Sequence, residues 1–278
     1  MDQESILAGS RPPPTGDATS LIGPDDPPVF TVVNGESRVP LLLVCDHASR
    51  AFPKAMGSLG LDEDALNRHI AYDIGAADVT LMLAERLGVT AVLCGYSRLM
   101  IDCNRAPGDP HSILEVSDGI VVPGNVGLTS AQQEARAEDI HWPYHHAVEQ
   151  NLARLRRSGP EPALFSIHSF TPTLNGEDRY WDIGVLWNRG PRLAVPLIKI
   201  LREHDHLHVG DNQPYSGQEI AYTIDLHAGA AGLANCAVEI RQDHCDTQDE
   251  AARWAVLLGD ALARILQTTD SLHRVAYF

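Results

Sequence analysis

Apolar runs of strand length alternate with segments of helical periodicity along this chain, and this alternation restricts the fold more than any other feature. We predict strands over residues 29–34, 39–47, 89–95, 98–102, 163–170, 182–187 and 236–242. We predict helices over residues 62–87, 129–157, 191–204 and 246–267. Strands and helices that alternate in this way form layered α/β structures around a mostly parallel sheet, and we expect that fold class here.

The sequence indicates one folded domain preceded by a flexible arm. Residues 1–29 are rich in Pro, Gly, Ser and Asp, a composition typical of mobile segments. Residues 30–278 contain no internal repeat and no Gly- or Ser-rich linker, so we expect them to form a single α/β domain. Within that domain Gly75 is expected to divide the first helical segment, Asp62 is a candidate cap for it, and Asp246 places a carboxylate at the start of the last helix.

The chain is strongly acidic, with 37 Asp and Glu side chains against 21 Lys and Arg and a formal net charge of -16. This charge disfavours nucleic acid and anionic membranes as partners. No apolar run approaches the ~20 residues that a membrane-spanning helix needs. An anionic substrate would require a local group of arginines to overcome the field of the whole protein.

The cysteines predict a protein of the reducing cytoplasm. They are five in number and scattered, and most are flanked by apolar residues, as buried thiols are. The N-terminus has neither the basic start nor the apolar stretch of a signal peptide. Cys103 alone lies in a polar motif, and a cysteine nucleophile there is the less favoured interpretation. Because GxGxxG, Walker, GxSxG and CxxC motifs are absent, four common functional classes lack their signature.

Reactive polar residues lie near the carboxyl ends of four predicted strands. His47 follows LLLVC and one aspartate, Asn104 and Arg105 follow RLMIDC, His168 follows ALFSI, and Glu239 lies within CAVEI. In parallel α/β sheets the functional loops gather at this edge. One such strand end would be coincidental, but four of them predict a functional site.

His47 and His168 are candidate metal ligands. Neutral imidazoles at two strand ends suit a catalytic Zn2+ site, which usually has three protein ligands and an open position. Asp73 and His69 are candidates for the third ligand, and Asp73 lies just before the expected helix break. Asp46 is a further candidate, although adjacent strand residues point to opposite faces. For either histidine alone a structural, hydrogen-bonded role is the alternative, but the pair favours a metal.

Glu239 is a candidate general base. A carboxylate among apolar strand residues is partly desolvated, which raises its pKa toward a useful value. Beside a metal it could accept a proton from water and later deliver it to a leaving amine. The alternative is a salt bridge to Arg241, which the spacing of two residues along a strand permits.

Arginines near the same edge predict a binding site for a carboxylate. Arg98, Arg105 and Arg241, together with Asn104, could form a cationic pocket, because the arginine fork binds carboxylates bidentately. Such a pocket predicts a small anionic substrate, such as a dicarboxylate or an acyl amino acid. The alternative is that these arginines pair with nearby aspartates, and Arg98 and Asp102 are spaced to do so.

Three further polar residues are candidates for substrate binding. Tyr215 and Ser216 lie in the loop NQPYSG, where their hydroxyl groups could donate hydrogen bonds to a substrate or an oxyanion. His227, in DLHAG, is the third.

Six segments carry a family resemblance: LLLVCDHASRAFP, NRHIAYDIGA, YSRLMIDCNRAP, FSIHSF, NQPYSG and VEIRQD. With them the chain resembles the N-formylglutamate amidohydrolases from about residue 38 to 265. The family is similar to the larger zinc carboxypeptidase-like group. The resemblance therefore implies a three-layer α/β sandwich around a mixed, mostly parallel sheet, with Zn2+ or another divalent metal as cofactor.

The resemblance also implies roles for individual residues. In the larger group a first His, a His-Ser-aromatic motif, an Asn-Arg pair and a Glu-x-Arg motif supply metal ligands, a grip on the substrate carboxylate, and the base. They are matched in that order by His47, by His168 with Ser169, by Asn104 with Arg105, and by Glu239 with Arg241.

Two departures from the pattern affect these expectations. The carboxypeptidases place a Glu three residues after the first His, where this chain has Arg50, so the second ligand is not carried over and Asp73 is taken in its place. Ala48 stands where the amidohydrolases of histidine breakdown usually have Ser. The chain therefore resembles a divergent branch.

We predict a hydrolase that cleaves the amide of a small N-acyl amino acid, with N-formyl-L-glutamate, giving formate and L-glutamate, as the named substrate. The alternatives are a related zinc deacylase or carboxypeptidase-like enzyme with another substrate, and an inactive protein that binds small carboxylates. The sequence does not determine the oligomeric state, and a homo-oligomer is left open.

Overall fold

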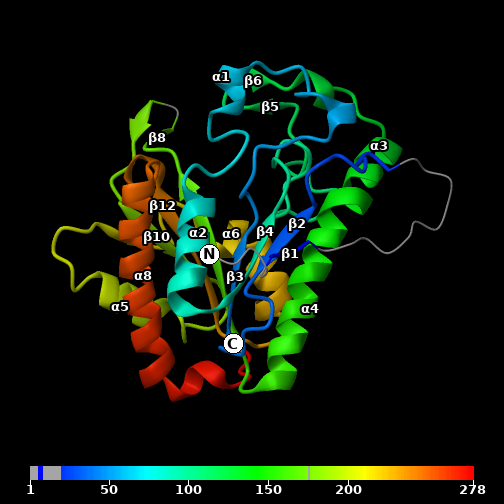
Figure 1. Ribbon diagram of the computed structural model, residues 1–278. Helices are drawn as coiled ribbons and strands as arrows, with labels where there is room; N and C mark the ends of the chain where they lie inside the picture. The colour runs from blue at the N-terminus through cyan, green and yellow to red at the C-terminus, as the bar shows by residue number, and fades with distance from the viewer. Residues whose placement is uncertain (1–5, 9–19, 175) are drawn as a thin grey trace.

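The computed structural model describes residues 6–8, 20–174 and 176–278, which form a central sheet between two layers of helices (Figure 1). The sheet has eight strands in the order β1-β2-β4-β3-β7-β12-β10-β11. They are β1 (Ile6–Ala8), β2 (Phe30–Val33), β3 (Leu41–Cys45), β4 (Thr90–Cys94), β7 (Ala163–Phe170), β10 (Ile183–Leu186), β11 (Val209–Asp211) and β12 (Asn235–Arg241). The predicted α/β class is confirmed.

Helices cover both faces of the sheet. One face packs against α2 (Ala76–Leu87), α5 (Ala194–Leu201) and α8 (Gln248–Thr268), and the other against α4 (Trp142–Ser158) and α7 (Tyr222–Ile224). The remaining α-helices are α1 (Glu63–Leu66), α3 (Ser130–Arg136) and α6 (Gly217–Ile220). Two π-helical turns are η3 (Ala137–His141) and η4 (Asp225–Gly229), and four 3-10 turns are η1 (Lys54–Met56), η2 (Pro123–Asn125), η5 (Gln242–His244) and η6 (Asp270–His273).

The four central strands β4, β3, β7 and β12 are parallel to one another, which confirms the mostly parallel sheet. At its flanks β2 and β10 run antiparallel to β4 and β12, so the sheet is mixed. The carboxyl ends of the parallel strands lie at the top of Figure 1. The loops there carry α1 and the hairpins β5 (Val116–Ser117) with β6 (Ile120–Val121) and β8 (Thr173–Leu174) with β9 (Glu177–Asp178).

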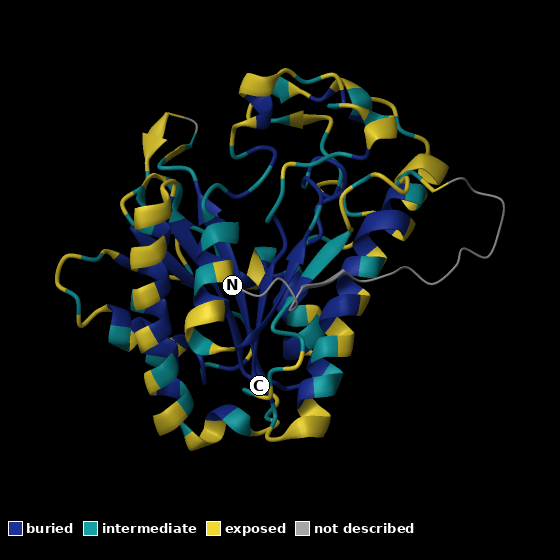
Figure 2. Ribbon diagram, viewed as in Figure 1, coloured by how far each residue is buried: buried dark blue, intermediate teal, exposed yellow. Residues whose placement is uncertain are grey.

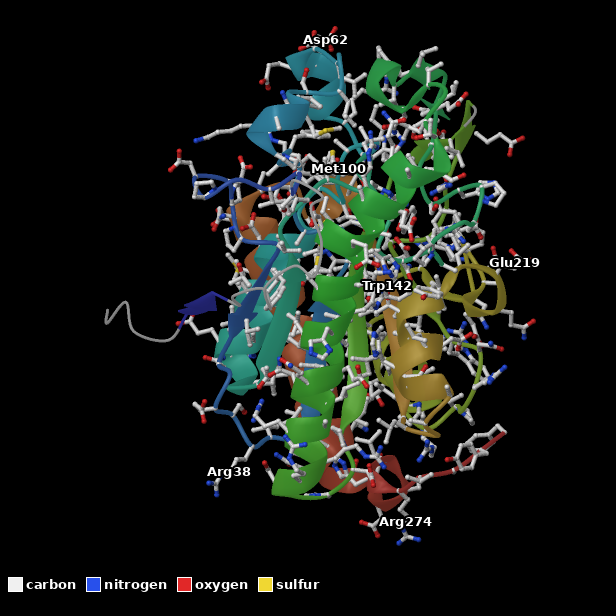
Figure 3. All side chains as sticks on the ribbon, turned by 90° about the vertical axis from the view of Figure 1, so that its right-hand side faces the viewer. Arg38, Asp62, Met100, Trp142, Glu219 and Arg274 are labelled. Atoms are coloured by element: carbon white, nitrogen blue, oxygen red, sulfur yellow. The ribbon has the colours of Figure 1, made fainter. Side chains whose placement is uncertain are left out.

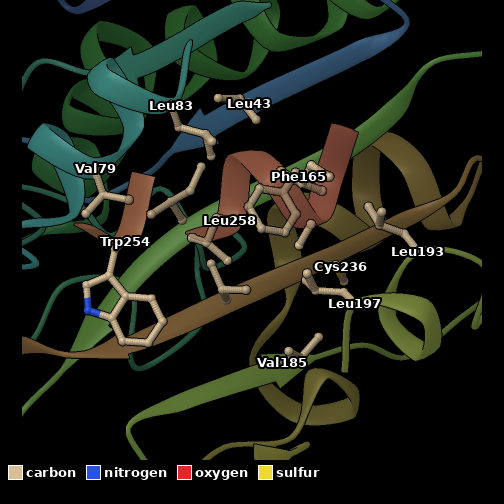
Figure 4. Close-up of a cluster of buried hydrophobic side chains, with 14 of the residues drawn as sticks. Leu43, Val79, Leu83, Phe165, Val185, Leu193, Leu197, Cys236, Trp254 and Leu258 are labelled. Atoms are coloured by element: carbon tan, nitrogen blue, oxygen red, sulfur yellow. The ribbon is translucent and has the colours of Figure 1, made fainter. Parts of the chain in front are cut away.

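The strands are buried and the outward helix faces are exposed (Figure 2). In the side view, α4 faces the reader from Trp142 downward, and Asp62 and Arg274 mark opposite ends of the molecule (Figure 3). Under α2 and α8, Leu43, Phe165 and Leu258 are fully buried and pack together (Figure 4). Since β3 and β7 alternate between two apolar clusters, both faces of the sheet are covered.

Several predicted boundaries are confirmed. The first helical segment is divided at Gly75, which has a left-handed φ of 79° and precedes α2, and Asp62 caps α1 with its side chain. The last helix begins differently, because Thr247 rather than Asp246 is its N-cap and accepts a hydrogen bond from the backbone N–H of Glu250.

The strand predicted over residues 98–102 is wrong. This segment is a buried turn in which the backbone N–H of Met100 donates to the carbonyl of Ser97 (2.9 Å). The Met100 carbonyl accepts a hydrogen bond from Arg136 (3.0 Å) instead of from a neighbouring strand. The apolar run is buried in the cluster that also contains side chains of α4, and burial alone does not distinguish a strand from such a turn. Strand β11, of three residues, was not predicted.

The arm expected over residues 1–29 lies largely outside the described residues, at positions 1–5 and 9–19. Ile6–Ala8 forms β1 against β2, and the carbonyl of Pro27 accepts a hydrogen bond from the Tyr96 hydroxyl at 2.6 Å. All five cysteines are buried and free. Among the described helices none combines the length and the apolar character needed to cross a membrane.

Candidate active site

The alternation of side chains along two neighbouring strands places His168 and Glu239 on one face of the sheet. In β7, Phe165 and Ile167 pack toward α2 and α8, so His168 points to the opposite face. In β12, Val238 and Ile240 also pack toward α2 and α8, so Glu239 between them points to the opposite face. His168 and Glu239 are also register partners in the parallel pairing of the two strands. The two predicted site residues therefore lie side by side near the carboxyl ends.

His47, Asp73 and His168 form a buried cluster that could hold a metal ion. One ligand atom of each lies within 4.8 Å of the others. The Nδ1 atoms of both histidines lie next to the same oxygen, Asp73 Oδ2, at 3.1 Å for His47 and 2.9 Å for His168. The predicted ligand set thus comes together from three distant parts of the chain, and Asp73, taken in place of the missing glutamate, belongs to it.

The other ring nitrogen of each histidine bonds a different carboxylate. His47 Nε2 is 2.7 Å from Asp102 Oδ1, and His168 Nε2 is 3.1 Å from Asp46 Oδ2. A neutral imidazole that donates from Nε2 has a lone pair on Nδ1, which here faces a carboxylate oxygen. Two nitrogen lone pairs and a carboxylate at one point require positive charge between them. Carboxylate–histidine pairs of this kind also orient histidines in metal sites, so the residues fit a divalent cation.

Protons on the two histidines are the other way to supply that positive charge, and the raised pKa values of both histidines show that the cluster stabilises it. Burial and the charge of Arg98 lower the pKa of His47, but Asp102 and Asp73 outweigh them and raise it to about 9. Burial likewise lowers the pKa of His168, and Asp46 and Asp73 raise it well above its usual value. The cluster therefore stabilises a cation, whether protons or a metal.

The backbone around Asp73 is fixed by contacts to the two histidine-bearing segments. The Asp73 N–H donates to the carbonyl of His47 (3.0 Å), and the Ser169 hydroxyl donates to the carbonyl of Ile74 (2.7 Å). Gly75 follows in left-handed conformation, and a Cβ there would lie 2.0 Å from the Cys245 carbonyl oxygen. Only glycine fits there, so the left-handed break that follows the buried Asp73 requires this residue.

A second layer of polar groups holds the two carboxylates behind the histidines. Asp46 accepts hydrogen bonds from the Tyr144 hydroxyl (2.8 Å) and the Thr223 hydroxyl (2.9 Å). Arg98 donates to Asp102 Oδ2 (2.6 Å) and to Asp73 Oδ1 (3.3 Å). The alternative that Arg98 pairs with Asp102 is therefore what the structure shows, and Arg98 also joins that aspartate to the candidate ligand Asp73.

Glu239 is buried beside this cluster. Its Oε2 atom has no hydrogen bond among the described residues. Burial raises the pKa of Glu239 to about 7, while the charges of His168 and His47 oppose the rise. The salt bridge considered for Arg241 is absent from the described residues, since that guanidinium pairs with Asp243 (2.8 Å) and Asp182 (3.7 Å). A buried carboxylate left free in this way can hold or release a proton near neutral pH.

Two glycines let a loop cross the sheet next to Glu239. Gly184 in β10 is the register partner of Glu239, and a Cβ on it would lie 2.0 Å from the carbonyl oxygen of Gln213. A Cβ on Gly210 in β11 would lie 2.5 Å from the same oxygen. The loop leads to Tyr215, whose pKa is raised by burial and by the charge of Glu239. Tyr215 is thus placed close to the cluster.

Three other residues predicted to bind substrate form hydrogen bonds within the protein. Asn104 donates to the Ile220 carbonyl (3.2 Å) and accepts from the Thr223 N–H (3.1 Å). Ser216 caps α6, and His227 bonds His145 at 2.8 Å. Arg105 lines a separate pocket of about 330 Å³ with Glu219, Tyr222 and Asp225 among its other lining residues.

Sequence reasoning missed the role of two residues. Asp102 was considered only as a partner for Arg98, although its place beside Asn104 at the edge of the sheet could have suggested a role next to a histidine. Arg179 was not considered, and no motif or spacing in the sequence distinguishes it. His69 is not part of the cluster and lies 3.7 Å from Asp118.

Comparisons with known sequences and structures identify relatives of this chain. Residues 39–245 match the sequence profile described as N-formylglutamate amidohydrolase. The N-formylglutamate deformylase of Pseudomonas aeruginosa is 26% identical over 243 residues, which cover 78% of this chain and 85% of that protein.

Among solved structures, a gene product of Agrobacterium tumefaciens superposes with a TM-score of 0.83 at 35% identity, covering 86% of this chain and 95% of that one. The N-formylglutamate amidohydrolase of Ralstonia eutropha superposes with a TM-score of 0.67 at 20% identity, covering 86% of this chain and 97% of that one, and shares the fold.

Proposed function

Because the chain belongs to the N-formylglutamate amidohydrolase family, we propose that it is a metal-dependent enzyme that hydrolyses the amide of a small N-acyl amino acid. We take N-formyl-L-glutamate as the substrate, with formate and L-glutamate as the products. One observation carries the proposal. Two histidines and an aspartate converge through atoms that cannot all be acceptors without a cation, and a free buried carboxylate lies beside them.

His47, Asp73 and His168 would hold the ion, and we propose Zn2+. Two imidazoles and one carboxylate are a common protein ligand set for catalytic zinc, and the carboxylates behind both histidines support the assignment. When bound, the ion would supply a Lewis acid for the acyl group and promote the ionisation of water.

Glu239 is the proposed general base. Its Oε2 would accept the proton of the attacking water and hold it while the C–N bond breaks, and it would then deliver that proton to the departing nitrogen. A pKa raised to about 7 by burial suits both steps, because the group can bind and release a proton near neutral pH. The carboxylate can do this because no other side chain among the described residues occupies that oxygen.

Tyr215 is the sequence-predicted binding residue that we propose contacts the substrate, since the loop across Gly184 carries it toward Glu239. We propose that Arg98 positions Asp73 and Asp102, and that Ser169 fixes the segment that carries Asp73. Roles in carboxylate binding for Arg105 and Arg241 remain predictions. The buried, free cysteines support a reducing compartment, and we propose the cytoplasm.

The test combines metal analysis of the purified protein with a formate-release assay on N-formyl-L-glutamate. We expect stoichiometric zinc and turnover in the wild type, and loss of turnover with the metal retained in Glu239→Gln. Glu85→Gln is the matched control, because this glutamate is exposed on α2 and lies outside both the cluster and the pocket of Arg105. Unchanged turnover in Glu239→Gln would exclude the base, and protein without bound metal that still turns over would exclude the metal mechanism.

A further inference from the structure

Arg179 lies on the segment between β9 and β10 and is held by two aromatic side chains. Its guanidinium carbon is 5.5 Å from the centre of the Phe170 ring and 4.7 Å from that of Tyr215. Its Nη1 donates a hydrogen bond to the Tyr215 hydroxyl at 2.7 Å. Stacking on aromatic faces fixes the planar fork and leaves its edge free to bind another group.

The charge of Arg179 is not neutralised by the protein. Among the described residues, no carboxylate lies within ion-pair distance of its guanidinium, whereas Arg98 and Arg241 each pair with two aspartates. Among the described residues, the side chain of Arg179 donates one hydrogen bond, and the acceptor is the Tyr215 hydroxyl. In a protein with a net charge of -16, a half-buried arginine that has no counter-ion among the described residues is suited to bind an anion.

The position of Arg179 relative to the catalytic cluster follows from strand register. Phe170 and Arg241 are register partners, and they lie two residues beyond the partners His168 and Glu239. Arg241 donates from Nη1 to the Arg179 carbonyl at 3.2 Å, so it fixes the backbone that carries this side chain. Two residues along a strand correspond to about 7 Å. Because its guanidinium lies over Phe170, Arg179 is about 7 Å further than Glu239 toward the carboxyl ends of these strands.

We propose that Arg179 binds the side-chain carboxylate of an acidic N-acyl amino acid and so sets the specificity of the enzyme for glutamate. This inference rests on the proposed function. In an N-acyl glutamate the cleaved carbonyl carbon is separated from the side-chain carboxyl carbon by five bonds, roughly 6 Å when extended. The α-carboxyl carbon is only three bonds from the cleaved carbonyl carbon, too close to span the distance of about 7 Å between Glu239 and Arg179. The spacing thus favours the side-chain carboxylate.

The test compares two substrates that differ only in the charge of the side chain, N-formyl-L-glutamate and N-formyl-L-glutamine. We expect Arg179→Met to raise KM for the glutamate compound about 10- to 100-fold, as expected for loss of a charge-assisted hydrogen bond, with little change in kcat. KM for the glutamine compound should stay within about twofold, because its uncharged side chain forms no ion pair with Arg179 that the substitution could remove. Arg157→Met, at an exposed arginine near the end of α4, is the matched control.

Arg179→Lys keeps the charge but loses the planar fork, so it should give an intermediate KM for the glutamate compound. This second variant also keeps the test usable if the Met variant unfolds. Equal KM increases on both substrates, or no increase on either, would overturn the assignment.

Failure of the proposed function can be separated from failure of this inference. If the wild type releases no formate from any N-formyl amino acid, the proposed function fails. Calorimetric titration with L-glutamate and L-glutamine then still tests Arg179. We expect the wild type to bind glutamate more tightly and Arg179→Met to lose that preference. A preference that survives in the variant would contradict the role of Arg179.

Discussion

His145 should make the stability of this protein depend on pH. The imidazole is buried on α4, with Nε2 at 2.8 Å from the Cys103 carbonyl oxygen and Nδ1 at 2.8 Å from His227 Nε2. Because Nε2 must donate to the carbonyl, Nδ1 accepts from His227, and protonation would place two donors face to face. Burial and the charges of His141 and His227 lower the pKa of His145 to about 3, against the opposing effect of Asp46.

The sign and the size of the effect follow from this shift. In the unfolded chain the pKa of a histidine is near 6.5, so between about pH 6.5 and pH 3 the unfolded state binds the proton more tightly. Folding stability is therefore lost as pH falls through this range. At pH 5 the difference is about 1.5 pH units, which corresponds to about 2 kcal/mol in the free energy of unfolding.

Denaturation with urea at pH 8 and pH 5 measures the prediction in the wild type and in His145→Gln. The amide of Gln can still donate to Cys103 but does not titrate. Other groups titrate in both proteins, so the informative quantity is the gap between their free energies of unfolding. We expect the gap to change by about 2 kcal/mol in favour of the variant at pH 5. Parallel pH dependences in the two proteins would refute the reasoning.

Three further predictions concern the site and the core. Asp102→Asn should weaken zinc binding about 10- to 100-fold in competition with a chromophoric chelator, because His47 loses its carboxylate partner, and unchanged affinity would contradict that role. Gly75→Ala should lower the thermal unfolding midpoint and the zinc content together, since its Cβ would meet the Cys245 carbonyl. Phe165→Ala should cost about 3–5 kcal/mol in urea denaturation and leave zinc per folded molecule unchanged, so a selective loss of zinc would argue against a purely structural role.

The sequence predicted the part of the site that follows strand ends. His47, His168 and Glu239 could be found because a parallel sheet brings the carboxyl ends of its strands to one edge. The family resemblance, and with it the hydrolase class, is confirmed by the profile match. Asp73 was chosen because it lies just before the predicted helix break at Gly75 and within a segment that resembles the family, and the structure places it in the buried cluster.

The remaining features depend on contacts that no local pattern encodes. Residues 98–102 have the composition of a strand, but they form a buried turn whose Met100 carbonyl is bonded by the distant Arg136. The proposed role of Arg179 depends on the loop after the neighbouring strand β11, which brings Tyr215 to it. The pairing of Arg98 with Asp102 is local in sequence, yet its link to Asp73 requires the tertiary fold.

The bare backbone at Gly184 and Gly210 has a consequence for how the enzyme could be altered. The carbonyl of Gln213 rests directly on the sheet there, so the height of this loop above the strands depends on two residues that have no side chain. A methyl group at either position would lift that loop and carry Tyr215 away from the carboxylate. Substitutions on the outer side of the loop, in contrast, would leave its height unchanged, and they offer a route to new substrates that keeps the chemistry intact.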